Sequence, residues 1–358
     1  MNSVLTIAQI STPNKIENPG GLERYVTSIN DARGEASNTK FISTSDLAPN
    51  LHWLNRSMLI ALHLFRNIRR FDVVESHFIL TGFISSILIP KPIVIFFHSP
   101  WAEERYVGGS QNGFLYLLRK KIEKIYLQRA HSIITVGKSM REYLLVEHDI
   151  APSKICVVGA GVDTDIFSFN PSINPEFIVF AARRIEMRMG ILELIHAWDL
   201  STLKKTGKLR IAGTGSQLAE AIHLIEELEL SDSVCMLGRV SEEVLVAEYQ
   251  NAAVSIIPTS ALEGFGLVCL ESFSCGTPVI STRIGELKFL VGEKWPELTY
   301  ESGQPKELAK ILDFVCANRQ ELPTRHEVND YSTQFTWDNT IRKISDVYTK
   351  IFINRFSL

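Results

Sequence analysis

The chain has 358 residues, of which 45% are hydrophobic and 22% are charged, and its formal net charge is −3. This length allows about two domains with ample cores, and the composition is that of an ordinary soluble globular protein. A net charge so close to zero excludes a global basic field, so nucleic acid is not expected as a partner.

The cysteines and the apolar runs narrow the class of protein further. The five cysteines form no C-x-x-C pair and have no metal-type spacing with histidine, which predicts reduced thiols and a cytoplasmic protein. No apolar run reaches the length needed to span a membrane, and the first residues are too weakly flanked for a signal peptide.

Apolar, β-branched runs alternate with helical patterns along the first half. Strands are expected at 4–10, 73–76, 92–97 and 132–136, and helices at 22–29, 54–70, 114–129 and 139–148. Gly20 and Gly21 stand before the first helical pattern, where the backbone can contact an anion or a sugar. Alone this signal is weak, because most Pro-Gly-Gly sequences are turns.

His98 follows the strand expected at 92–97. Open α/β sheets bind ligands at the carboxyl ends of their strands, so His98 is a candidate site residue. A histidine that caps a strand or fills the core is an equally good interpretation of this residue alone.

The helix expected at 114–129 carries apolar residues on one side and five basic residues on the other. This pattern favours a helix that packs its apolar side on its own sheet and keeps its basic side in solvent. A basic amphipathic helix also suits an anionic membrane surface, which is therefore a further partner to test.

The second half opens after a proline-containing linker at 171–175. The strand expected at 177–182 delivers Arg184 and Arg188 ahead of a helix that begins after Gly190. Arginines in this place suit two-pronged binding of a phosphate, and both are candidate site residues.

A second glycine-containing turn follows the strand that begins at Leu209. Gly213 and Gly215 end this strand, but Leu218 stands where a dinucleotide fingerprint needs its third glycine. A tight strand–helix turn is therefore preferred to an NAD site.

The densest group of candidate residues lies at 258–278. A strand at 253–257 leads into the loop 264–266 (Gly-Phe-Gly), whose backbone can come close to a ligand. A short helix follows, and the free N–H groups of its start, near Leu267 and Val268, suit a phosphate.

Two carboxylates, Glu263 and Glu271, flank that loop and helix start. At helical rise their separation is at most roughly 12 Å, and more if the loop is extended. This is about the reach of a sugar–diphosphate–ribose unit, so one carboxylate can hold sugar hydroxyls and the other ribose hydroxyls. A surface glutamate and a helix-dipole glutamate are the alternative for an arbitrary pair.

This segment resembles the Glu-x7-Glu signature of glycosyltransferase family 4, the retaining nucleotide-sugar transferases of GT-B fold. The loop, the spacing and the trailing Cys-Gly-Thr-Pro-Val-Ile at 275–280 all agree with the family. The resemblance covers nearly the whole chain and is strongest over 155–285. Two positions depart from it: Ala160 replaces the usual Asn, and Met189 replaces the usual Lys before Gly190.

The resemblance implies an α/β protein of GT-B architecture, with two doubly wound Rossmann-like domains that face each other across a cleft. Residues 1–165 would form the acceptor-side domain and 166–336 the nucleotide-sugar donor domain. A C-terminal helix, within 337–358, would cross back to the first domain.

The implied activity is retaining, hexosyltransferase-type transfer of a sugar from a UDP- or GDP-sugar to a hydroxyl acceptor. The acceptor would be a glycan, a lipid-linked or a small molecule, in bacterial-type polysaccharide, lipopolysaccharide or glycoconjugate synthesis. The protein would be cytoplasmic or peripheral on the inner face of the membrane. Asp163-Thr164-Asp165 has the letters of a metal motif but lies in the expected hinge, so no metal or other cofactor is expected.

The resemblance also implies roles for named residues. Glu263 would hold the sugar, Arg184 and Arg188 would stabilise the leaving diphosphate, and His98 would meet the sugar or the acceptor. The residues expected to bind the donor are Gly20, Gly21, Gly213, Arg239, Val240, Gly264, Phe265, Gly266, Leu267, Val268 and Glu271. A nucleotide-sugar epimerase of the same fold and a non-catalytic GT-B scaffold remain as alternatives.

Overall fold

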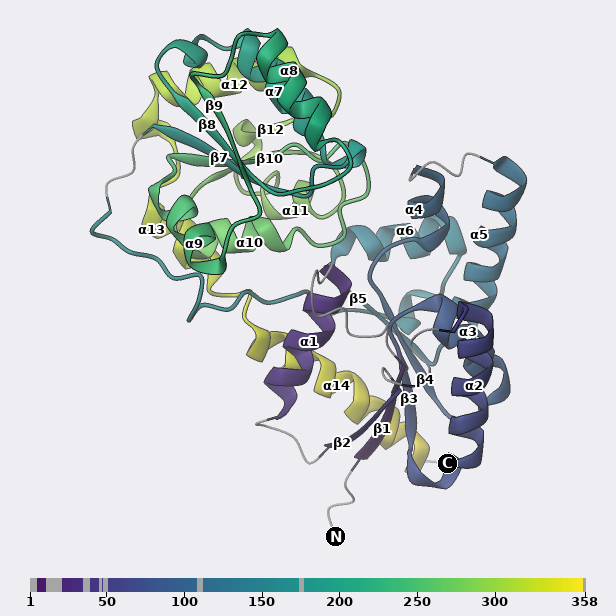
Figure 1. The fold of residues 1–358 in the computed structure, drawn as a ribbon. Coiled ribbons are helices and arrows are strands. Elements are labelled where there is room, and N and C mark those ends of the chain that lie inside the picture. Colours follow the sequence, from purple (N-terminus) through teal and green to yellow (C-terminus); the bar gives the residue numbers. More distant parts are fainter. Residues whose placement is uncertain are drawn as a thin grey trace. The chain divides into compact units, whose positions relative to one another are not determined.

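A computed structural model of the chain describes residues 5–10, 21–34, 39–44, 47, 51–107, 112–173 and 177–356. The chain divides into two compact units (Figure 1). Unit 1 comprises Met1–Ala160 and Trp337–Leu358, and unit 2 comprises Gly161–Thr336. The division after Ala160 lies five residues before the predicted one.

Unit 1 is built on a parallel sheet with the strand order β2-β1-β3-β4-β5-β6. Its strands are β1 (Leu5–Ile10), β2 (Thr39–Ser43), β3 (Val73–Ser76), β4 (Ile93–Phe97), β5 (Ser132–Thr135) and β6 (Ile155–Val157). Its helices are α1 (Gly21–Gly34), α2 (Trp53–Arg66), α3 (Ile79–Leu88), α4 (Trp101–Val107), α5 (Gly113–Gln128), α6 (Lys138–His148) and α14 (Trp337–Phe356).

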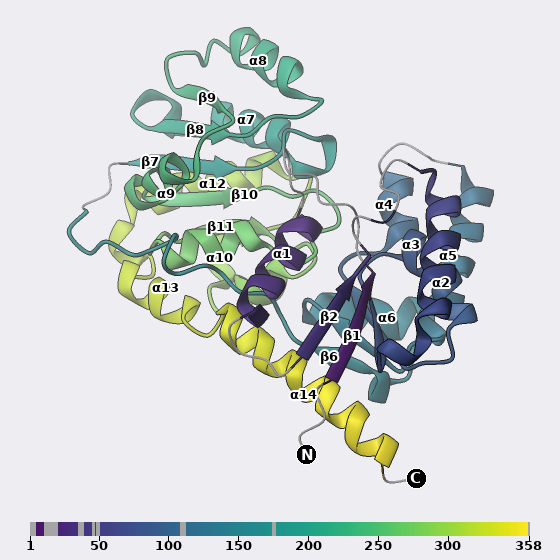
Figure 2. The same cartoon turned by 60° about the horizontal axis from the view of Figure 1, so that its bottom comes forward.

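Two layers of helices cover this sheet. Helices α1 and α14 lie together on one face, and α2, α3 and α5 lie on the other (Figures 1 and 2). Successive side chains of a strand point to opposite faces. In β3, accordingly, Glu75 contacts α1 and α14, whereas Ser76 accepts a hydrogen bond from Tyr126 of α5.

Unit 2 repeats this plan with the strand order β12-β11-β10-β7-β8-β9, again parallel. Its strands are β7 (Ile178–Ala182), β8 (Lys208–Ala212), β9 (Val234–Gly238), β10 (Val254–Ile257), β11 (Val279–Thr282) and β12 (Thr299–Tyr300). Its helices are α7 (Ile191–Leu200), α8 (Leu218–Glu227), α9 (Glu242–Asn251), α10 (Leu267–Ser274), α11 (Leu287–Leu290), α12 (Pro305–Ala317) and α13 (Arg325–Ser332). Helices α7, α8 and α12 pack as one group, and α9, α10 and α13 as another.

Each strand order reverses at one place, and this fixes where a ligand is expected. In unit 2 the chain runs outward from β7 to β8 and β9, then from β10 to β11 and β12, so the switch lies between β7 and β10. In unit 1 the switch lies between β1 and β3. Ligands of open α/β sheets bind at the carboxyl ends of the strands at such a switch.

One prediction about the surface of unit 1 was wrong. Helix α5 does not pack its apolar side on the sheet along its whole length, because Phe114 and Leu117 near its start are exposed. The residues that α5 buries are Glu123, Tyr126 and Leu127, in its second half.

Candidate functional site

In unit 2 the loops after β7 and β10 come together at the switch point, and glycines permit the close approach. Gly190 has a φ of +71°, and a Cβ built on it would lie 1.8 Å from the carbonyl oxygen of Pro258. Gly285, with a φ of +56°, would place a Cβ 2.1 Å from the carbonyl oxygen of Glu263. No side chain fits at either position, so the backbone around Glu263 is fixed by its neighbours.

Arg183, the first residue after β7, binds the Glu263 carboxylate. Its Nη2 lies 2.6 Å from Oε2 of Glu263 and also donates to Oγ1 of Thr259. The Thr259 hydroxyl in turn donates to the same carboxylate oxygen over 3.1 Å. Burial would raise the pKa of Glu263, but Arg183, with Thr259 and Arg188, outweighs it and holds this pKa below its usual range. Glu263 is therefore ionised at neutral pH.

The same Nη2 atom of Arg183 lies 3.0 Å from the sulfur of Met189. Its Nε atom is buried and has no hydrogen-bond partner among the residues that the structure describes. A guanidinium has five donors in a fixed fork, and Glu263 is bound by only one nitrogen of Arg183. Arg183 thus keeps donor capacity beside the loop.

Arg184 and Arg188, the two arginines predicted from the sequence, differ in burial and in their contacts. Arg188, in a short 3-10 turn at Met187–Met189, is half-buried and donates through Nη1 to the carbonyl oxygen of Leu262 over 2.7 Å. Leu262 has a φ of +55°, a left-handed conformation that costs a leucine about 1–3 kcal/mol. Arg188 therefore supports the strained turn that presents Glu263. Arg184 is exposed.

A helix begins after Gly266, as predicted, and its role in phosphate binding stays a prediction. Gly266, with a φ of +79°, is the N-cap of α10, and the first hydrogen bonds to its carbonyl come from Cys269 and Leu270. The N–H groups of Leu267 and Val268 precede those bonds and so have no acceptor within the helix. Gly264 is half-buried and Phe265 is buried. A loop of this kind can place backbone donors against an anion.

The second predicted carboxylate, Glu271, is only 3% exposed on α10. The Tyr249 hydroxyl lies 3.5 Å from its Oε2 atom. Its role as a ribose ligand stays a prediction.

The other residues expected to bind the donor are spread over three further strand ends. Gly213 follows β8, and a Cβ on it would lie 1.7 Å from the carbonyl oxygen of Arg183, so this glycine lets the loop of Arg183 pack. Arg239 is exposed and Val240 half-buried after β9. Gly21 is the first residue of α1, and Gly20 lies outside the described residues.

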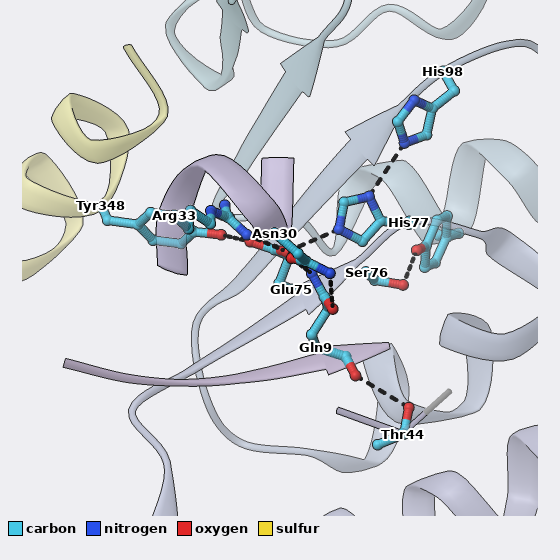
Figure 3. Close-up of polar contacts among 10 residues, drawn as sticks. Gln9, Asn30, Arg33, Thr44, Glu75, Ser76, His77, His98 and Tyr348 are labelled. Carbon is cyan, nitrogen blue, oxygen red and sulfur yellow. Dashed lines mark hydrogen bonds and ion pairs between the residues drawn. The ribbon is translucent and has the colours of Figure 1, made fainter. Parts of the chain in front are cut away.

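In unit 1, His98 follows β4 and is half-buried. Its Nε2 lies 3.2 Å from Nδ1 of His77, whose Nε2 lies 2.8 Å from Oε1 of Glu75 (Figure 3). Tyr25 packs the edge of its ring against His98, with ring centroids 5.0 Å apart. Burial, and then the nearby His77, hold the pKa of His98 well below its usual range, although Glu75 acts in the opposite direction. His98 is therefore neutral at physiological pH.

Glu75 is the centre of a polar cluster inside unit 1. Both its oxygens accept from Arg33, over 3.0 and 2.9 Å, and Gln9 donates to Oε1 over 2.7 Å. The Tyr348 hydroxyl of α14 donates to Oε2 (Figure 3). Burial would raise the pKa of Glu75, but Arg33 and His77 outweigh it and hold this pKa well below its usual range. His98 was predicted from the sequence but this cluster was not, although a glutamate inside an apolar strand was a signal for it.

Among the residues that the structure describes, no group of three or more His, Cys, Asp or Glu side chains is arranged to hold a metal ion. None of the described helices is long and apolar enough to cross a membrane.

Comparison with known proteins identifies the family. The model "Glycosyltransferase Family 4" matches residues 30–166, and "Glycosyl transferases group 1" matches residues 162–335. An uncharacterized glycosyltransferase of Methanocaldococcus jannaschii is 25% identical over 83% of this chain and 81% of its own length. The D-inositol 3-phosphate glycosyltransferase of Mycolicibacterium smegmatis is 26% identical over 78% of this chain and 67% of its own length.

A similar solved structure is that of HepE from Anabaena, in complex with UDP and glucose. It matches 97% of this chain and 100% of its own with a TM-score of 0.77 at 17% identity. Its GT-B fold agrees with the two parallel-sheet units described above. The two family models together span residues 30–335, most of the chain, and the chain belongs to the family 4 type of glycosyltransferases.

Proposed function

We propose that this glycosyltransferase moves a sugar from a nucleotide-diphosphate sugar, UDP- or GDP-linked, to a hydroxyl acceptor with retention of anomeric configuration. The observation that carries this proposal is the convergence of ionised Glu263, Arg183, Arg188 and the start of α10 at the switch point of unit 2. Glu186 is a second carboxylate nearby, whose pKa is lowered by Ser216 and, to a smaller degree, by Arg184 and Arg188. The three guanidinium groups of Arg183, Arg184 and Arg188 thus exceed the two carboxylates by one positive charge, to which the helix start adds. This suits a diphosphate.

In the proposed reaction the bond between the sugar anomeric carbon and the diphosphate oxygen breaks, and a bond to the acceptor oxygen forms on the same face. The acceptor hydroxyl proton leaves with the released nucleotide. Negative charge grows on the diphosphate, so preorganised donors beside it act more strongly on the transition state than on the bound donor. Glu263 would hold the sugar and Glu271 the ribose.

Arg183 is a cation that was not predicted as a site residue from the sequence. The family usually has Lys at the position of Met189, and in this chain the Arg183 guanidinium lies against the sulfur of that methionine. We assign to Arg183 the charge that Lys supplies in the family, beside the predicted Arg184 and Arg188. With cations and a helix start available for the diphosphate, we also propose that no metal is required.

A thermal-shift screen against UDP, GDP, ADP and their sugars tests the donor class, since ligand binding raises apparent stability by mass action. HepE was crystallised with UDP, so UDP-sugars come first. We expect one nucleotide diphosphate and its sugar to raise the melting temperature, and Arg183→Ala to reduce that shift. Arg210→Ala is the matched control, because Arg210 also pairs with a glutamate, Glu248, in unit 2. No shift with any nucleotide would contradict the proposal.

Product analysis tests the chemistry. With donor and acceptor present, proton NMR of the product should show the same anomeric configuration, axial or equatorial, as that of the donor sugar. A product of inverted configuration would refute retention. Conversion of the donor sugar without an acceptor would favour an epimerase, and binding without turnover would favour a scaffold.

The acceptor side includes a surface suited to a membrane. Helices α2 and α5, which both pack on α3, expose large apolar side chains, with Met58 66% and Phe114 76% exposed. Basic residues accompany them, including exposed Arg66 and Lys121. We propose that this surface lies on anionic lipid and that the acceptor is lipid-linked or membrane-associated, in the synthesis of a bacterial-type glycoconjugate.

Flotation of the protein with liposomes tests this proposal. We expect binding to anionic vesicles that added salt releases, and weaker binding for Phe114→Ser. Equal, negligible flotation with neutral and anionic vesicles would remove the membrane from the proposal.

A further inference from the structure

The polar cluster of unit 1 determines which nitrogen of His98 carries a proton. Every group that contacts the Glu75 carboxylate can donate to it: both Nη atoms of Arg33, the amide of Gln9, the hydroxyl of Tyr348 and Nε2 of His77. An ionised carboxylate only accepts hydrogen bonds. The nitrogen of His77 that faces Glu75 therefore carries a hydrogen and donates it.

The charge balance of the cluster favours a neutral His77. The side chains of Glu75 and His77 are fully buried, and that of Arg33 is 5% exposed. Arg33 already compensates the charge of Glu75, in a two-pronged pair. An imidazolium at His77 would be a second buried cation on the one carboxylate that Arg33 already neutralises, and the net buried charge would be costly.

The positions of both protons follow from these two points. Neutral His77 donates through Nε2, so its Nδ1 has a lone pair and accepts. The atom 3.2 Å away, Nε2 of His98, must then be the donor. Since His98 is neutral too, its other nitrogen, Nδ1, is an acceptor. That atom makes no hydrogen bond to any described residue, and the ring is half-buried.

We propose that Glu75 and His77 are positioning residues that fix His98 in the Nε2–H tautomer, so that its Nδ1 accepts a hydrogen bond from a substrate hydroxyl. The inference rests on the proposed function, because it needs a hydroxyl-bearing substrate. The hydroxyl belongs either to the donor sugar or to the acceptor. His98 would contact the substrate, while Glu75 and His77 act through it.

The groups around His98 agree with an uncharged acceptor. On α1 the edge of Tyr25 faces the ring, and its hydroxyl donates to the carbonyl oxygen of Gly159. Burial raises the pKa of Tyr25, so this phenol carries no charge. Phe96 of β4 stacks on both His77 and His98. The charged groups near the ring, Glu75 and Arg33, lie behind His77 and compensate each other.

Nitrogen-15 NMR of histidine-labelled protein reads the tautomer directly, with His98→Gln to assign the signal. We expect a protonated Nε2 and an unprotonated Nδ1 in His98 of the wild type at neutral pH. A protonated Nδ1, or an imidazolium, would overturn the proposal. This readout does not need turnover, so it distinguishes failure of this inference from failure of the proposed function.

Substitution of His77 tests the consequence for catalysis. His77→Phe keeps a buried ring and leaves Glu75 its bonds from Arg33, Gln9 and Tyr348, so the fold should persist. We expect kcat or kcat/KM to fall about ten- to hundred-fold, as is typical when the group that orients a functional imidazole is lost. His77→Asn should recover part of this, because its side-chain oxygen can accept from His98.

The matched control is His148→Phe. His148 is also a buried histidine of unit 1 that contacts a carboxylate, Glu123, over 2.9 Å. The His148→Phe substitution should lower the stability of the protein but leave its turnover unchanged. A fall in turnover for His148→Phe equal to that for His77→Phe would show that general destabilisation, not positioning, is the cause. Wild-type kinetics for His77→Phe would also overturn the proposal.

The same variants identify the substrate hydroxyl. If it belongs to the donor sugar, His77→Phe will weaken binding of the intact nucleotide sugar but not of the free nucleotide. If it belongs to the acceptor, donor binding will be unchanged while kcat/KM for the acceptor falls. If donor binding and kcat/KM for the acceptor are both unchanged in His77→Phe, a contact of His98 with either substrate hydroxyl would be contradicted.

Discussion

Each unit of this protein contains a buried guanidinium–carboxylate pair, and the two pairs differ in how completely they are satisfied. Arg33 binds Glu75 with two nitrogens, and further donors complete the carboxylate. Arg183 binds Glu263 with one nitrogen, and its buried Nε has no partner in the described part of the chain. Arg33 therefore holds its carboxylate in a closed, two-pronged pair inside unit 1, whereas Arg183 keeps unused donor capacity with which it can also hold a ligand.

The largest expected effect is on the stability of unit 1. Arg33→Met leaves the buried Glu75 carboxylate without its counter-ion, and we expect a loss of about 3–5 kcal/mol in the free energy of unfolding. Denaturant titration followed by circular dichroism measures it. Arg33→Met combined with Glu75→Gln should recover most of the loss, since both charges are gone. A single variant as stable as the wild type would mean that the pair is not a structural element.

In unit 2 the expected effect is on turnover. Arg183→Ala removes a preorganised cation, which typically costs about 3–4 kcal/mol of transition-state stabilisation, or about a hundred- to thousand-fold in kcat. The initial rate of nucleotide release measures this, with unfolding transitions as a check on the fold. Wild-type turnover in Arg183→Ala would reduce this pair to the structural role of its counterpart.

A rescue variant tests whether the role of Arg183 is that of a cation. Met189→Lys in the Arg183→Ala background puts an ammonium group where the family usually has one, and we expect about ten-fold recovery of the lost rate. Only partial recovery is expected, because a point charge lacks the forked geometry of a guanidinium. Met189→Leu in the same background is the control, and equal rates for Lys and Leu would argue against a missing cation.

The smallest expected effect is on how the stability of the protein depends on pH. The pKa of His98 is lowered in the folded protein, so below its unfolded-state value of about 6.5 the unfolded chain binds a proton that the native one does not. The contribution of His98 to stability is thus present above that pH and lost as the pH falls. One unit below, at pH 5.5, we expect a loss of up to about 1.4 kcal/mol, the free-energy equivalent of one pKa unit.

Comparison of wild type and His98→Gln in urea at pH 7.5 and 5.5 measures this loss. The variant should lose less stability over that interval. Glu75, whose pKa is also lowered, contributes the same sign at more acidic pH in both proteins and does not disturb the comparison. Identical losses in the two proteins would mean that His98 titrates normally.

The strands with β-branched apolar runs were predictable, because a buried parallel strand needs such residues on both faces. β3 and most of β4, β5 and β7 lie where the sequence predicted them. Strand β2 was missed, since its Thr-Lys start gives no apolar signal. Helix α3 was missed because a short, nearly all-apolar segment with two serines has no helical periodicity.

The site was predictable as a set of loops but not as a set of contacts. Arg183 and Arg184 are adjacent at the end of β7, and the family resemblance favoured Arg184. Which of the two reaches Glu263 depends on Thr259 and on the close packing at Gly190 and Gly213, residues far apart in the sequence. The Glu75 cluster likewise joins residues from four separate elements.

The hydrogen bond from Tyr348 to Glu75 joins residues that are 273 positions apart. Helix α14 is synthesised after all of unit 2, yet it belongs to unit 1. Unit 2 is continuous in sequence and can fold while the ribosome is still translating, whereas the carboxylate of Glu75 must wait for its last partner. Co-translational folding of this protein is therefore expected to finish with its first domain, and premature chain termination before residue 337 would leave that domain the more exposed to proteolysis.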